Sequence, residues 1–392
     1  MEEKIMERKD EGLAFLLRYE NVAWFEKDRV TILDRRIYPE KIQYVECSRW
    51  EDVRQAIADM VTQSAGPYTA AGMGMALAAY QARDKSAAQQ RLFLEAAAEG
   101  LATARPTTAN RMRQITAGCL TAANRALDAG ESAAAAIFNA VIESLNRRYG
   151  TMEIVGNYLA DLFPHGGGVL TQCFGETIVG MMLRAARARN NPVKLFCAET
   201  RPFLQGARLT ASCAADMGFD TTVITDNMVA YCMQHERIDL FTSAADTIAR
   251  DGHIANKIGT FQIALLADHF GIPYYVTGIP DADKKSAADI RIEQRDPFEA
   301  LSCRGVRHTL ERVKGLYPAF DITPPELIRG IVTDKAPAIS ARILTRLKTD
   351  STKEPFRPRS LQVKLFTLYY GIYERDKTSC KPQLQRLCRL VQ

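Results

Sequence analysis

The chain has 392 residues, of which 47% are hydrophobic and 25% are charged. This composition excludes a disulfide-rich miniprotein, a collagen-like chain and an intrinsically disordered protein, and the length allows about two or three domains. The net charge is +5, but residues 351–392 hold nine Lys or Arg against three Asp or Glu, so the rest of the chain is close to neutral. Because nucleic-acid-binding proteins usually carry a basic face on their folded part, nucleic acid is a disfavoured partner.

The sequence gives no sign of a membrane or secretory segment. No stretch approaches the about 18–20 apolar residues of a membrane-spanning helix, and the charged N-terminus lacks the apolar region of a signal peptide. We therefore expect a cytoplasmic protein with no membrane partner. The nine cysteines include no CxxC pair, and there are only five histidines, so we expect reduced thiols and no structural metal site. The cysteines are at positions 47, 119, 173, 197, 213, 232, 303, 380 and 388.

The first elements in chain order are strands, and helices follow them. Residues 21–26 and 29–34 predict a β-hairpin that turns at Lys27 and Asp28, and residues 42–47 predict another strand. From Trp50 to about Arg148 the chain is rich in Ala, Leu and Glu, which favour helix, with breaks near 64–66 and 105–106. Residues 1–150 are therefore predicted to form an N-terminal domain with a β-hairpin and a helical part.

After residue 168 the pattern changes to short apolar strands that alternate with helices. The strands are expected at 169–174, 193–199, 221–226, 239–244 and 274–278, and the main helices at 176–189, 205–217 and 257–270. This alternation predicts an α/β fold with a parallel, doubly wound, Rossmann-like sheet. We assign residues 151–341 to this domain and residues 342–392 to a basic C-terminal extension of unknown role.

Polar residues stand at the carboxyl ends of four predicted strands. They are Cys173, Glu199, Asp226 and Asp246. Each could be a loop cap or a surface residue. Ligands of such sheets bind outside the carboxyl ends of the strands, so four polar residues in succession favour a pocket there.

Several longer runs resemble one known family, the methylthioribose-1-phosphate isomerases and their paralogues. The runs are Glu199-Thr-Arg-Pro-Phe-Leu-Gln-Gly-Ala-Arg-Leu-Thr, Asp226-Asn-Met, Ala255-Asn-Lys-Ile-Gly-Thr, Arg105-Pro-Thr, Leu170-Thr-Gln-Cys and Pro318-Ala-Phe-Asp-Ile-Thr-Pro. The resemblance covers roughly residues 20–340. The family also contains ribose-1,5-bisphosphate isomerases and the regulatory subunits of the translation-initiation guanine-nucleotide exchange factor, so it implies the fold more firmly than the substrate.

The resemblance implies that Cys173 and Asp246 form a catalytic pair. A sugar 1-phosphate has an esterified anomeric oxygen, so ring opening needs a proton on the ring oxygen, and a carboxyl with a raised pKa suits that step. Moving hydrogen from C2 to C1 then needs a base at C2 or a hydride shift. Cys173 could be that base if nearby positive charge lowered its pKa, although Glu176 would oppose this. Without the resemblance, Cys173 reads as a buried strand thiol and Asp246 as a loop cap.

The resemblance also implies a phosphate site made by Arg105, Gln205, Asn256 and Lys257. Lys257 is expected to open a helix, so that helix N–H groups and the ammonium converge on one anion, although Asn256 could simply cap that helix. Arg201 and Arg208 are expected to form structural bridges with Glu199 or Asp226 rather than to touch the substrate.

Three departures from the family pattern surround this site. The family's phosphate loop reads R-G-A-P-A-I-G, whereas the corresponding residues 63–72 here contain no Arg. Phe174 and Glu176 follow Cys173, where the isomerases carry small polar residues and Gly, and Thr247 instead of Arg follows Asp246. These changes predict an altered substrate.

The sequence as a whole predicts an aldose–ketose isomerase that converts a sugar 1-phosphate to the ketose 1-phosphate without a metal or a cofactor. Methylthioribose 1-phosphate, a substrate of methionine salvage, or a close analogue is the first candidate. The alternatives are an isomerase of another phosphorylated pentose, such as ribose 1,5-bisphosphate or 5-deoxyribose 1-phosphate, and a non-catalytic regulatory or ligand-sensing relative. Retention of both Cys173 and Asp246 favours an enzyme, and the resemblance implies a homodimer.

Overall fold

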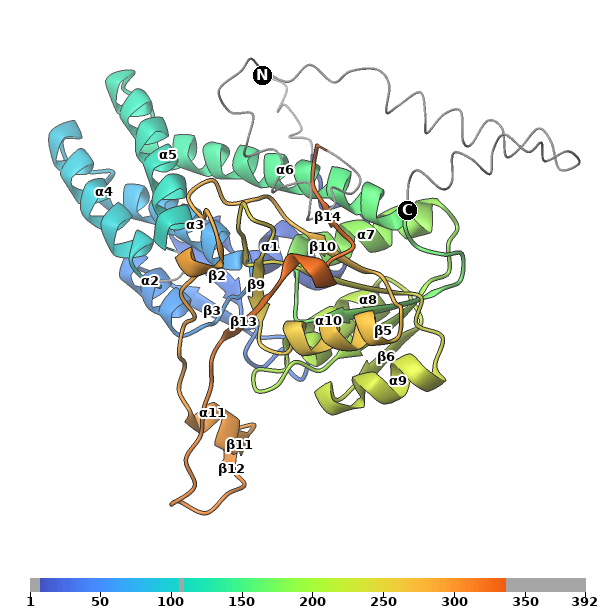
Figure 1. Cartoon of the computed structure of the whole chain (residues 1–392). Coiled ribbons are helices and arrows are strands. Elements are labelled where there is room, and N and C mark those ends of the chain that lie inside the picture. Colours follow the sequence, from blue (N-terminus) through green and yellow to red (C-terminus); the bar gives the residue numbers. More distant parts are fainter. Residues whose placement is uncertain (1–7, 106–108, 336–392) are drawn as a thin grey trace, which may run out of the picture. The chain divides into compact units, whose positions relative to one another are not determined.

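The computed structural model describes residues 8–105 and 109–335, which belong to one compact unit (Figure 1). The predicted extension at 342–392 lies outside the described residues. Within the described ranges, no helix has the length and apolar character needed to cross a membrane.

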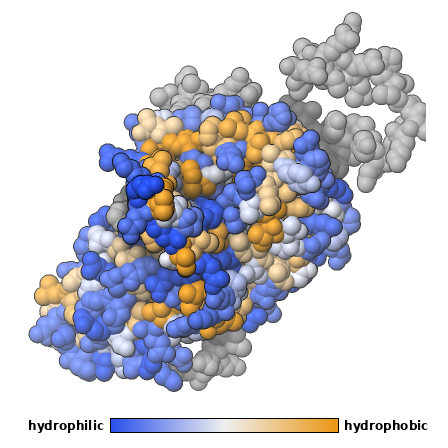
Figure 2. Space-filling view, turned by 90° about the horizontal axis from the view of Figure 1, so that it is seen from below, coloured by the Kyte–Doolittle hydropathy of each residue, from blue (hydrophilic) through white to orange (hydrophobic). Residues whose placement is uncertain are grey.

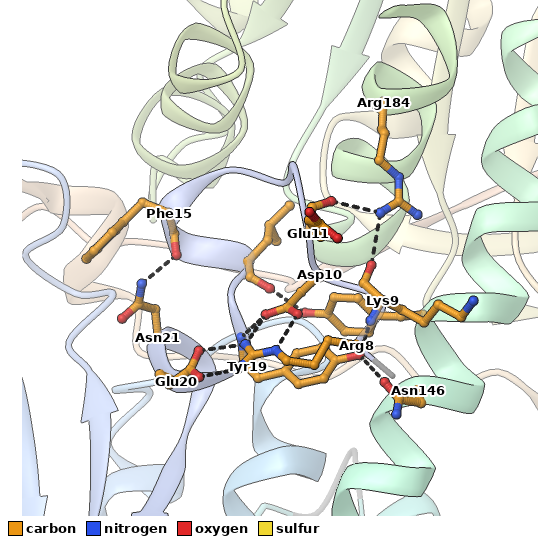
Figure 3. Close-up of polar contacts among 12 residues, drawn as sticks. Arg8, Lys9, Asp10, Glu11, Phe15, Tyr19, Glu20, Asn21, Asn146 and Arg184 are labelled. Atoms are coloured by element: carbon orange, nitrogen blue, oxygen red, sulfur yellow. Dashed lines mark hydrogen bonds and ion pairs between the residues drawn. The ribbon is translucent and has the colours of Figure 1, made fainter. Parts of the chain in front are cut away.

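Polar contacts fix the first described residues between two long helices, as Figure 3 shows. The carboxylate of Asp10 accepts the backbone N–H of Tyr19 at 2.9 Å, and the Tyr19 hydroxyl donates to Asn146 on α6 (Ala133–Ala160) at 2.7 Å. Arg184 on α7 (Glu176–Ala188) donates to two backbone carbonyls of residues 9–11. Two short elements lie in this region, η1 (Phe15–Leu17) and α1 (Tyr19–Val22).

The predicted hairpin is present, with one correction. Strands β1 (Trp24–Glu26), β2 (Arg29–Leu33) and β3 (Tyr44–Cys47) form an antiparallel sheet in the order β1-β2-β3. The first residues of the predicted strand at 21–26 belong instead to α1. The apolar side chains of α1 are buried, and Tyr19 lies in the same core as side chains of α6. The segment is therefore apolar because it is buried, and not because it is a strand.

Five helices follow, and besides the predicted breaks near 64–66 and 105–106 they break at 83–86 and 129–132, which the sequence did not predict. They are α2 (Trp50–Ala58), α3 (Gly66–Ala82), α4 (Ala87–Ala102), α5 (Ala109–Asp128) and α6. Small residues let them approach closely, since a Cβ on Gly72 of α3 would lie 2.7 Å from Val141 of α6. Helix α6 runs across residue 150, so the division of the chain at that position stays a prediction.

Six parallel strands form the main sheet and confirm the predicted α/β class. They are β4 (Gly168–Gln172), β5 (Lys194–Ala198), β6 (Thr221–Ile224), β7 (Leu240–Ala244), β10 (Tyr274–Thr277) and β14 (Gly330–Val332). Their order is β14-β10-β7-β4-β5-β6. The chain therefore proceeds outward from β4 in one direction, returns to the other side of β4 with β7, and continues outward to β14. The sequence did not predict β14.

Helices cover both faces of this sheet, which follows from the alternation of strand side chains. Val169 faces one core and Leu170 the other, and Leu240 and Phe241 divide in the same way. One core is shared with α6, α7 and the short α8 (Ser212–Asp216), and the other with α9 (Val229–His235) and α10 (Thr260–His269). A sheet with two buried faces needs strands that are apolar on both sides, as these are.

A second, smaller sheet was not predicted. Strands β8 (Thr247–Ile248), β9 (Ile254–Lys257) and β13 (Phe320–Thr323) pair antiparallel in the order β13-β9-β8. The predicted helix at 257–270 therefore begins later, at Thr260. The remaining elements are η3 (Gly206–Ala211), η4 (Asp226–Met228), η5 (Ala287–Asp289), α11 (Phe298–Leu301), β11 (Ser302–Cys303), β12 (Val306–Arg307) and η6 (Pro325–Leu327).

Candidate active site

The predicted catalytic pair lies where the winding of the main sheet reverses. Cys173 directly follows β4, and Asp246 comes two residues after the end of β7, and these two strands are neighbours. Strands β5 and β6 lie on one side of β4, and strands β7, β10 and β14 lie on the other side. Ligands of doubly wound sheets bind in the crevice at this switch point. The fold therefore brings together two residues that are 73 positions apart in the sequence.

Cys173 has a left-handed backbone that hydroxyl groups hold in place. Its φ is 62°, which is unusual for a residue with a side chain. The Cys173 N–H donates to Oγ1 of Thr200 at 2.8 Å, and the hydroxyl of Thr210 donates to the Cys173 carbonyl. Thr210 belongs to η3, a π-helical turn, and Gly206 in it is required because a Cβ there would lie 1.8 Å from the Ala198 carbonyl oxygen. Such turns often occur at functional sites.

The Cys173 thiol is protonated near neutral pH. Burial raises the pKa of the Cys173 thiol to about 11, and the positive charges of Lys257 and Arg295 offset only part of this rise. A thiolate base would require a lowered pKa. The sequence-based condition for Cys173 to act as a base is therefore not met in the protein without a bound substrate.

Asp246 is a carboxyl group in an open but crowded position. Water still reaches its side chain, while surrounding protein removes part of its hydration and raises its pKa above the ordinary value. Four cations oppose this rise, in the order Lys257, Arg295, Arg105 and Arg111. A carboxyl group that holds its proton more firmly than usual, beside positive charge, suits acid–base work on an anionic substrate.

Lys257 lies on a strand and not at the start of a helix. It is the last residue of β9, it is buried, and its Nζ stands 4.4 Å from the centre of the Phe320 ring on β13. Burial lowers the pKa of Lys257, and the nearby Cys173 and Asp246 oppose that change. The Lys257 ammonium therefore interacts electrostatically with both predicted catalytic residues.

The N-terminus of α10 is capped by the protein's own carboxylate. Asp321 accepts the N–H groups of Gly259 at 2.7 Å and Phe261 at 3.2 Å, and burial raises its pKa to about 6. These donors are therefore occupied, which contradicts the expectation that they hold the substrate anion. Asn256 is not the side-chain cap of α10, which begins after Gly259. The Asn256 side-chain amide instead donates to the Thr260 hydroxyl at 3.0 Å.

Arg201 and Arg208 are structural, as expected, but their partners differ from the prediction. Arg201 donates to the backbone carbonyl of Ser302 at 2.8 Å, and Arg208 to those of Phe203 and Tyr38. Neither guanidinium bonds Glu199 or Asp226 in the contacts of the described residues. Asp226 instead accepts the backbone N–H groups of Thr200 and Arg201 and so shapes the loop after β5.

Glu176, which departs from the family pattern, is not a free charge beside Cys173. It is buried, pairs with the buried Arg35 at 2.9 Å, and accepts the backbone N–H of Ala65 at 2.8 Å. Its charge is therefore compensated. The contact also ties the turn that carries Cys173 to the loop at 63–66.

The structure brings most of the predicted site residues together and adds others. Cys173, Asp246, Lys257 and Arg105 interact electrostatically, and Asn256 joins them through Thr260, whose hydroxyl also donates to Gln172 beside Cys173. Gln205 is buried with an unpartnered side-chain oxygen, and its place in the site stays a prediction.

Sequence reasoning missed three residues of this site. They are Tyr68, Arg111 and Arg295. Tyr68 lies in the altered loop and Arg111 lies shortly after the Arg105-Pro-Thr run, but Arg295 is far from every matched run, and nothing in the spacing of the three marked them. No group of three or more His, Cys, Asp or Glu side chains with metal-binding geometry occurs among the residues that the structure describes.

The chain is similar to proteins named methylthioribose-1-phosphate isomerase over most of its length. It is 36% identical to the methylthioribose-1-phosphate isomerase of Chloroflexus aurantiacus (strain J-10-fl) over 327 residues, which cover 80% of this chain and 93% of that protein. It is 37% identical to the enzyme of the same name from Geobacillus kaustophilus over 333 residues, covering 80% and 91%.

Solved structures place the fold in the same group. The 5-methylthioribose 1-phosphate isomerase of Pyrococcus horikoshii superposes with a TM-score of 0.74 at 29% identity, covering 85% of this chain and 97% of that one. The translation initiation factor eIF-2B subunit delta of A. fulgidus superposes with a TM-score of 0.69, also at 29% identity, covering 80% and 94%. The model of the Initiation factor 2 subunit family matches residues 64–336. The chain therefore belongs to the Initiation factor 2 subunit family, and within it resembles the methylthioribose-1-phosphate isomerases.

Proposed function

We propose that the protein is an aldose–ketose isomerase that converts a sugar 1-phosphate, methylthioribose 1-phosphate or a close analogue, to the ketose 1-phosphate. The observation that carries the proposal is the position of Cys173 and Asp246 after two neighbouring strands at the switch point, where the two interact electrostatically with each other and with Lys257. Similarity to the isomerases of Chloroflexus and Geobacillus supports the same reaction. Because the family also contains initiation-factor subunits, the assignment depends on these residues more than on the fold.

Asp246 can supply both proton transfers that the reaction needs. Its neutral carboxyl donates a proton to the ring oxygen, the bond between C1 and the ring oxygen breaks, and C1 is left electron-poor with its phosphate ester intact. Hydrogen then moves from C2 to C1, and the resulting carboxylate of Asp246 accepts the proton of the C2 hydroxyl, which leaves a ketone at C2. A raised pKa favours the first of these steps.

The protonated state of Cys173 favours a hydride shift over proton abstraction at C2. A thiol with a pKa of about 11 is a weak base at neutral pH, because only a small fraction is ionised. A hydride shift needs no base at C2 but needs water to be excluded, and a neutral thiol beside the reacting carbons serves that purpose. Cys173 is then a catalytic residue that contacts C1 and C2 without carrying charge.

We further propose that Lys257, Arg105, Gln205 and Asn256 hold the phosphate. Lys257 is buried near the proposed catalytic residues, and burial lowers the pKa of both Lys257 and Arg105. Burial disfavours the charged form of each side chain, and a bound phosphate would stabilise that charged form. The protein is proposed to act in the cytoplasm as a homodimer.

The test is turnover followed by NMR with methylthioribose 1-phosphate, ribose 1,5-bisphosphate and 5-deoxyribose 1-phosphate. The parent protein should form a ketose 1-phosphate from at least one of them, and Cys173→Ala and Asp246→Asn should each lower kcat by about 100-fold or more. In D2O, a hydride shift leaves the product without deuterium at C1, whereas proton transfer through Cys173 introduces it. Absence of turnover with all three sugars, in a folded protein, would contradict the proposal.

A further inference from the structure

Three backbone N–H groups of the altered loop at 63–72 already have partners within the protein. The N–H of Ala65 donates to Glu176 at 2.8 Å, that of Gly66 to the Gln63 carbonyl at 3.0 Å, and that of Tyr68 to the Ala65 carbonyl at 3.2 Å. Pro67 has no N–H. The start of α3 therefore has its donors satisfied within the protein, and the loop has no Arg of its own.

The two arginines nearest this loop are committed to holding it. Arg35 pairs with Glu176 and donates to the Gln63 carbonyl at 3.1 Å. Arg148 donates to the Ala65 carbonyl at 3.1 Å and to the Thr69 hydroxyl at 3.2 Å. Both therefore act as structural supports, and the cation that the family carries in this loop must come from another element if it is present at all.

Arg111, in the first turn of α5, is placed to supply that cation. It interacts with the Tyr68 side chain of the altered loop and with Asp246. Tyr68 also interacts with Arg105, so Arg111 approaches the same part of the site as a predicted phosphate ligand. Of the Arg111 side chain 54% is exposed, so a ligand can reach it.

Asp281 fixes Arg111 relative to the catalytic carboxyl. Arg111 Nη2 lies 3.3 Å from Asp281 Oδ1, and the other carboxylate oxygen of Asp281 accepts the N–H of Ile248 at 3.0 Å. The Asp281 N–H in turn donates to the Ile248 carbonyl at 2.9 Å. Ile248 is only two residues after Asp246, so the guanidinium is joined to the strand that starts beside the active carboxyl. It uses one of several N–H donors for this pair.

Arg295, the other cation missed by the sequence, has a different role. Only 11% of its side chain is exposed, it pairs with Glu293 at 3.2 Å, and its guanidinium lies within 6 Å of the Tyr317 and Phe320 rings. It is packed into the wall of the site. Arg111 is thus the accessible cation of the two.

We propose that Arg111, positioned by Asp281 and Tyr68, is a further phosphate-binding residue that replaces the arginine absent from the loop at 63–72. This inference rests on the proposed function, because it assigns the group that Arg111 binds to the phosphate of the sugar. Under this proposal the site has a phosphate-binding arginine, as in the family pattern. The arginine comes from the first turn of α5 instead of from the loop before α3.

The test combines phosphate binding with kinetics. Calorimetry measures the affinity of the full-length protein for inorganic phosphate, and steady-state assays measure KM and kcat for a sugar 1-phosphate that the parent converts. Arg111→Leu should weaken phosphate binding and raise KM by about 10- to 100-fold with kcat nearly unchanged, as expected for loss of a charged hydrogen bond. Arg111→Lys should restore part of the affinity. Asp281→Asn keeps an oxygen acceptor that can position Arg111 but removes the competing negative charge, so it should tighten phosphate binding.

Arg113→Leu is the matched control. Arg113 lies on the same helix, half of its side chain is exposed, and it pairs with Glu99 away from these residues, so its loss should leave both measurements unchanged. Parent-like phosphate affinity and KM in Arg111→Leu would overturn the inference, as would an equal effect of Arg113→Leu. If the parent binds phosphate through Arg111 but converts no sugar 1-phosphate, the proposed function fails while the anion site stands.

Discussion

At the scale of single residues, the site shifts the pKa values of its acidic and its basic side chains in opposite directions. Loss of hydration raises the pKa of Asp246 and of Cys173 and lowers that of Lys257. Neighbours of opposite charge oppose each shift, whereas Asp246 adds to the rise at Cys173 and Arg295 adds to the fall at Lys257. Both acids are thus biased toward their neutral forms. A sugar phosphate brings its own negative charge, which favours protonated neighbours further. The site is therefore prepared to donate a proton before it accepts one.

The protonated state of Cys173 can be measured by its alkylation. Since the thiolate is the reactive form, the rate of reaction with iodoacetamide should rise with pH to a midpoint of about 11. Lys257→Met should move the midpoint still higher, because Lys257 lowers the thiol pKa. Mass spectrometry of the Cys173 peptide distinguishes it from Cys303, which is exposed.

Lys194→Met is the control for this measurement. Lys194 is an exposed residue at the start of β5 that pairs with Asp220, so its loss should leave the midpoint unchanged. A midpoint for Cys173 near that of an unperturbed cysteine, about 8.5, would show that burial does not control this thiol, and would restore it as a candidate base.

At the scale of elements, a buried ion pair joins the β-hairpin region to α7. Arg35 is 0% exposed and Glu176, the first residue of α7, is 1% exposed. Arg35 also lies over the Phe174 ring and donates to the Leu16 carbonyl. The pair thus holds the turn that begins at Cys173, whose left-handed backbone needs support from its surroundings.

This pair should show strong coupling in a double-mutant cycle. Glu176→Gln leaves Arg35 buried without a counter-ion, so it should lower the free energy of unfolding by about 3–5 kcal/mol, measured by urea denaturation. The double variant Arg35→Met, Glu176→Gln removes both charges and should lose less stability than the sum of the single variants Arg35→Met and Glu176→Gln. Glu99→Gln, which breaks the exposed pair with Arg113, should change little. Additive effects at Arg35 and Glu176 would contradict this account.

The long elements could be read from the sequence, and the short ones could not. Helices α3 to α6 and strands β4 to β7 have patterns that extend over enough residues to show their period. Strands β8, β9, β13 and β14 have two to four residues each, and their pairing depends on partners far along the chain. Lys257 was misplaced for this reason, because the apolar pattern of α10 extends back into β9 and the cap of that helix comes from Asp321.

The site was partly predictable for a similar reason. Cys173, Lys257 and Arg105 stand in runs that resemble a known family, and the resemblance also pointed to Asp246. In the structure Asp246 interacts electrostatically with the other three, while their roles stay predictions. Arg111 and Tyr68 could not be found, because their role depends on contacts with Asp281 and Asp246 that only the tertiary structure creates. The compensation of Glu176 by Arg35, 141 residues away, was equally invisible.

At the scale of the whole described chain, the site depends on three separately built parts. The helical part provides Arg105 and Arg111, the main sheet provides Cys173 and Asp246, and the small antiparallel sheet provides Lys257. One hydrophobic core runs without a break from the β-hairpin through α6 and α7 to the main sheet. The helical part, which carries the cations, and the main sheet, which carries the predicted catalytic residues, therefore share one packed core.

The segment between α11 and β13 projects from the rest of the described chain (Figure 1), and it carries apolar side chains that are exposed to solvent. Val306 is 70% exposed and Leu316 77%, and Leu310 and Val313 are exposed as well. Figure 2, viewed from below, shows hydrophobic residues gathered among hydrophilic ones on this face. Exposed apolar groups on a projecting segment are typical of a subunit contact, and the proposed homodimer provides a second copy to cover them.

Light scattering of the full-length protein tests this arrangement. The mass should be about twice the 43.7 kDa of one chain, and Val306→Glu with Leu316→Glu should reduce it toward the mass of one chain, because two buried charges oppose association. Ile42→Glu, which changes an exposed apolar residue of another region, should leave the mass unchanged. A parent mass of a single chain across the micromolar range would contradict the homodimer. If the double variant is still a dimer, the subunit contact does not include this segment. The two introduced carboxylates would then remain exposed to water in the dimer and would not oppose association.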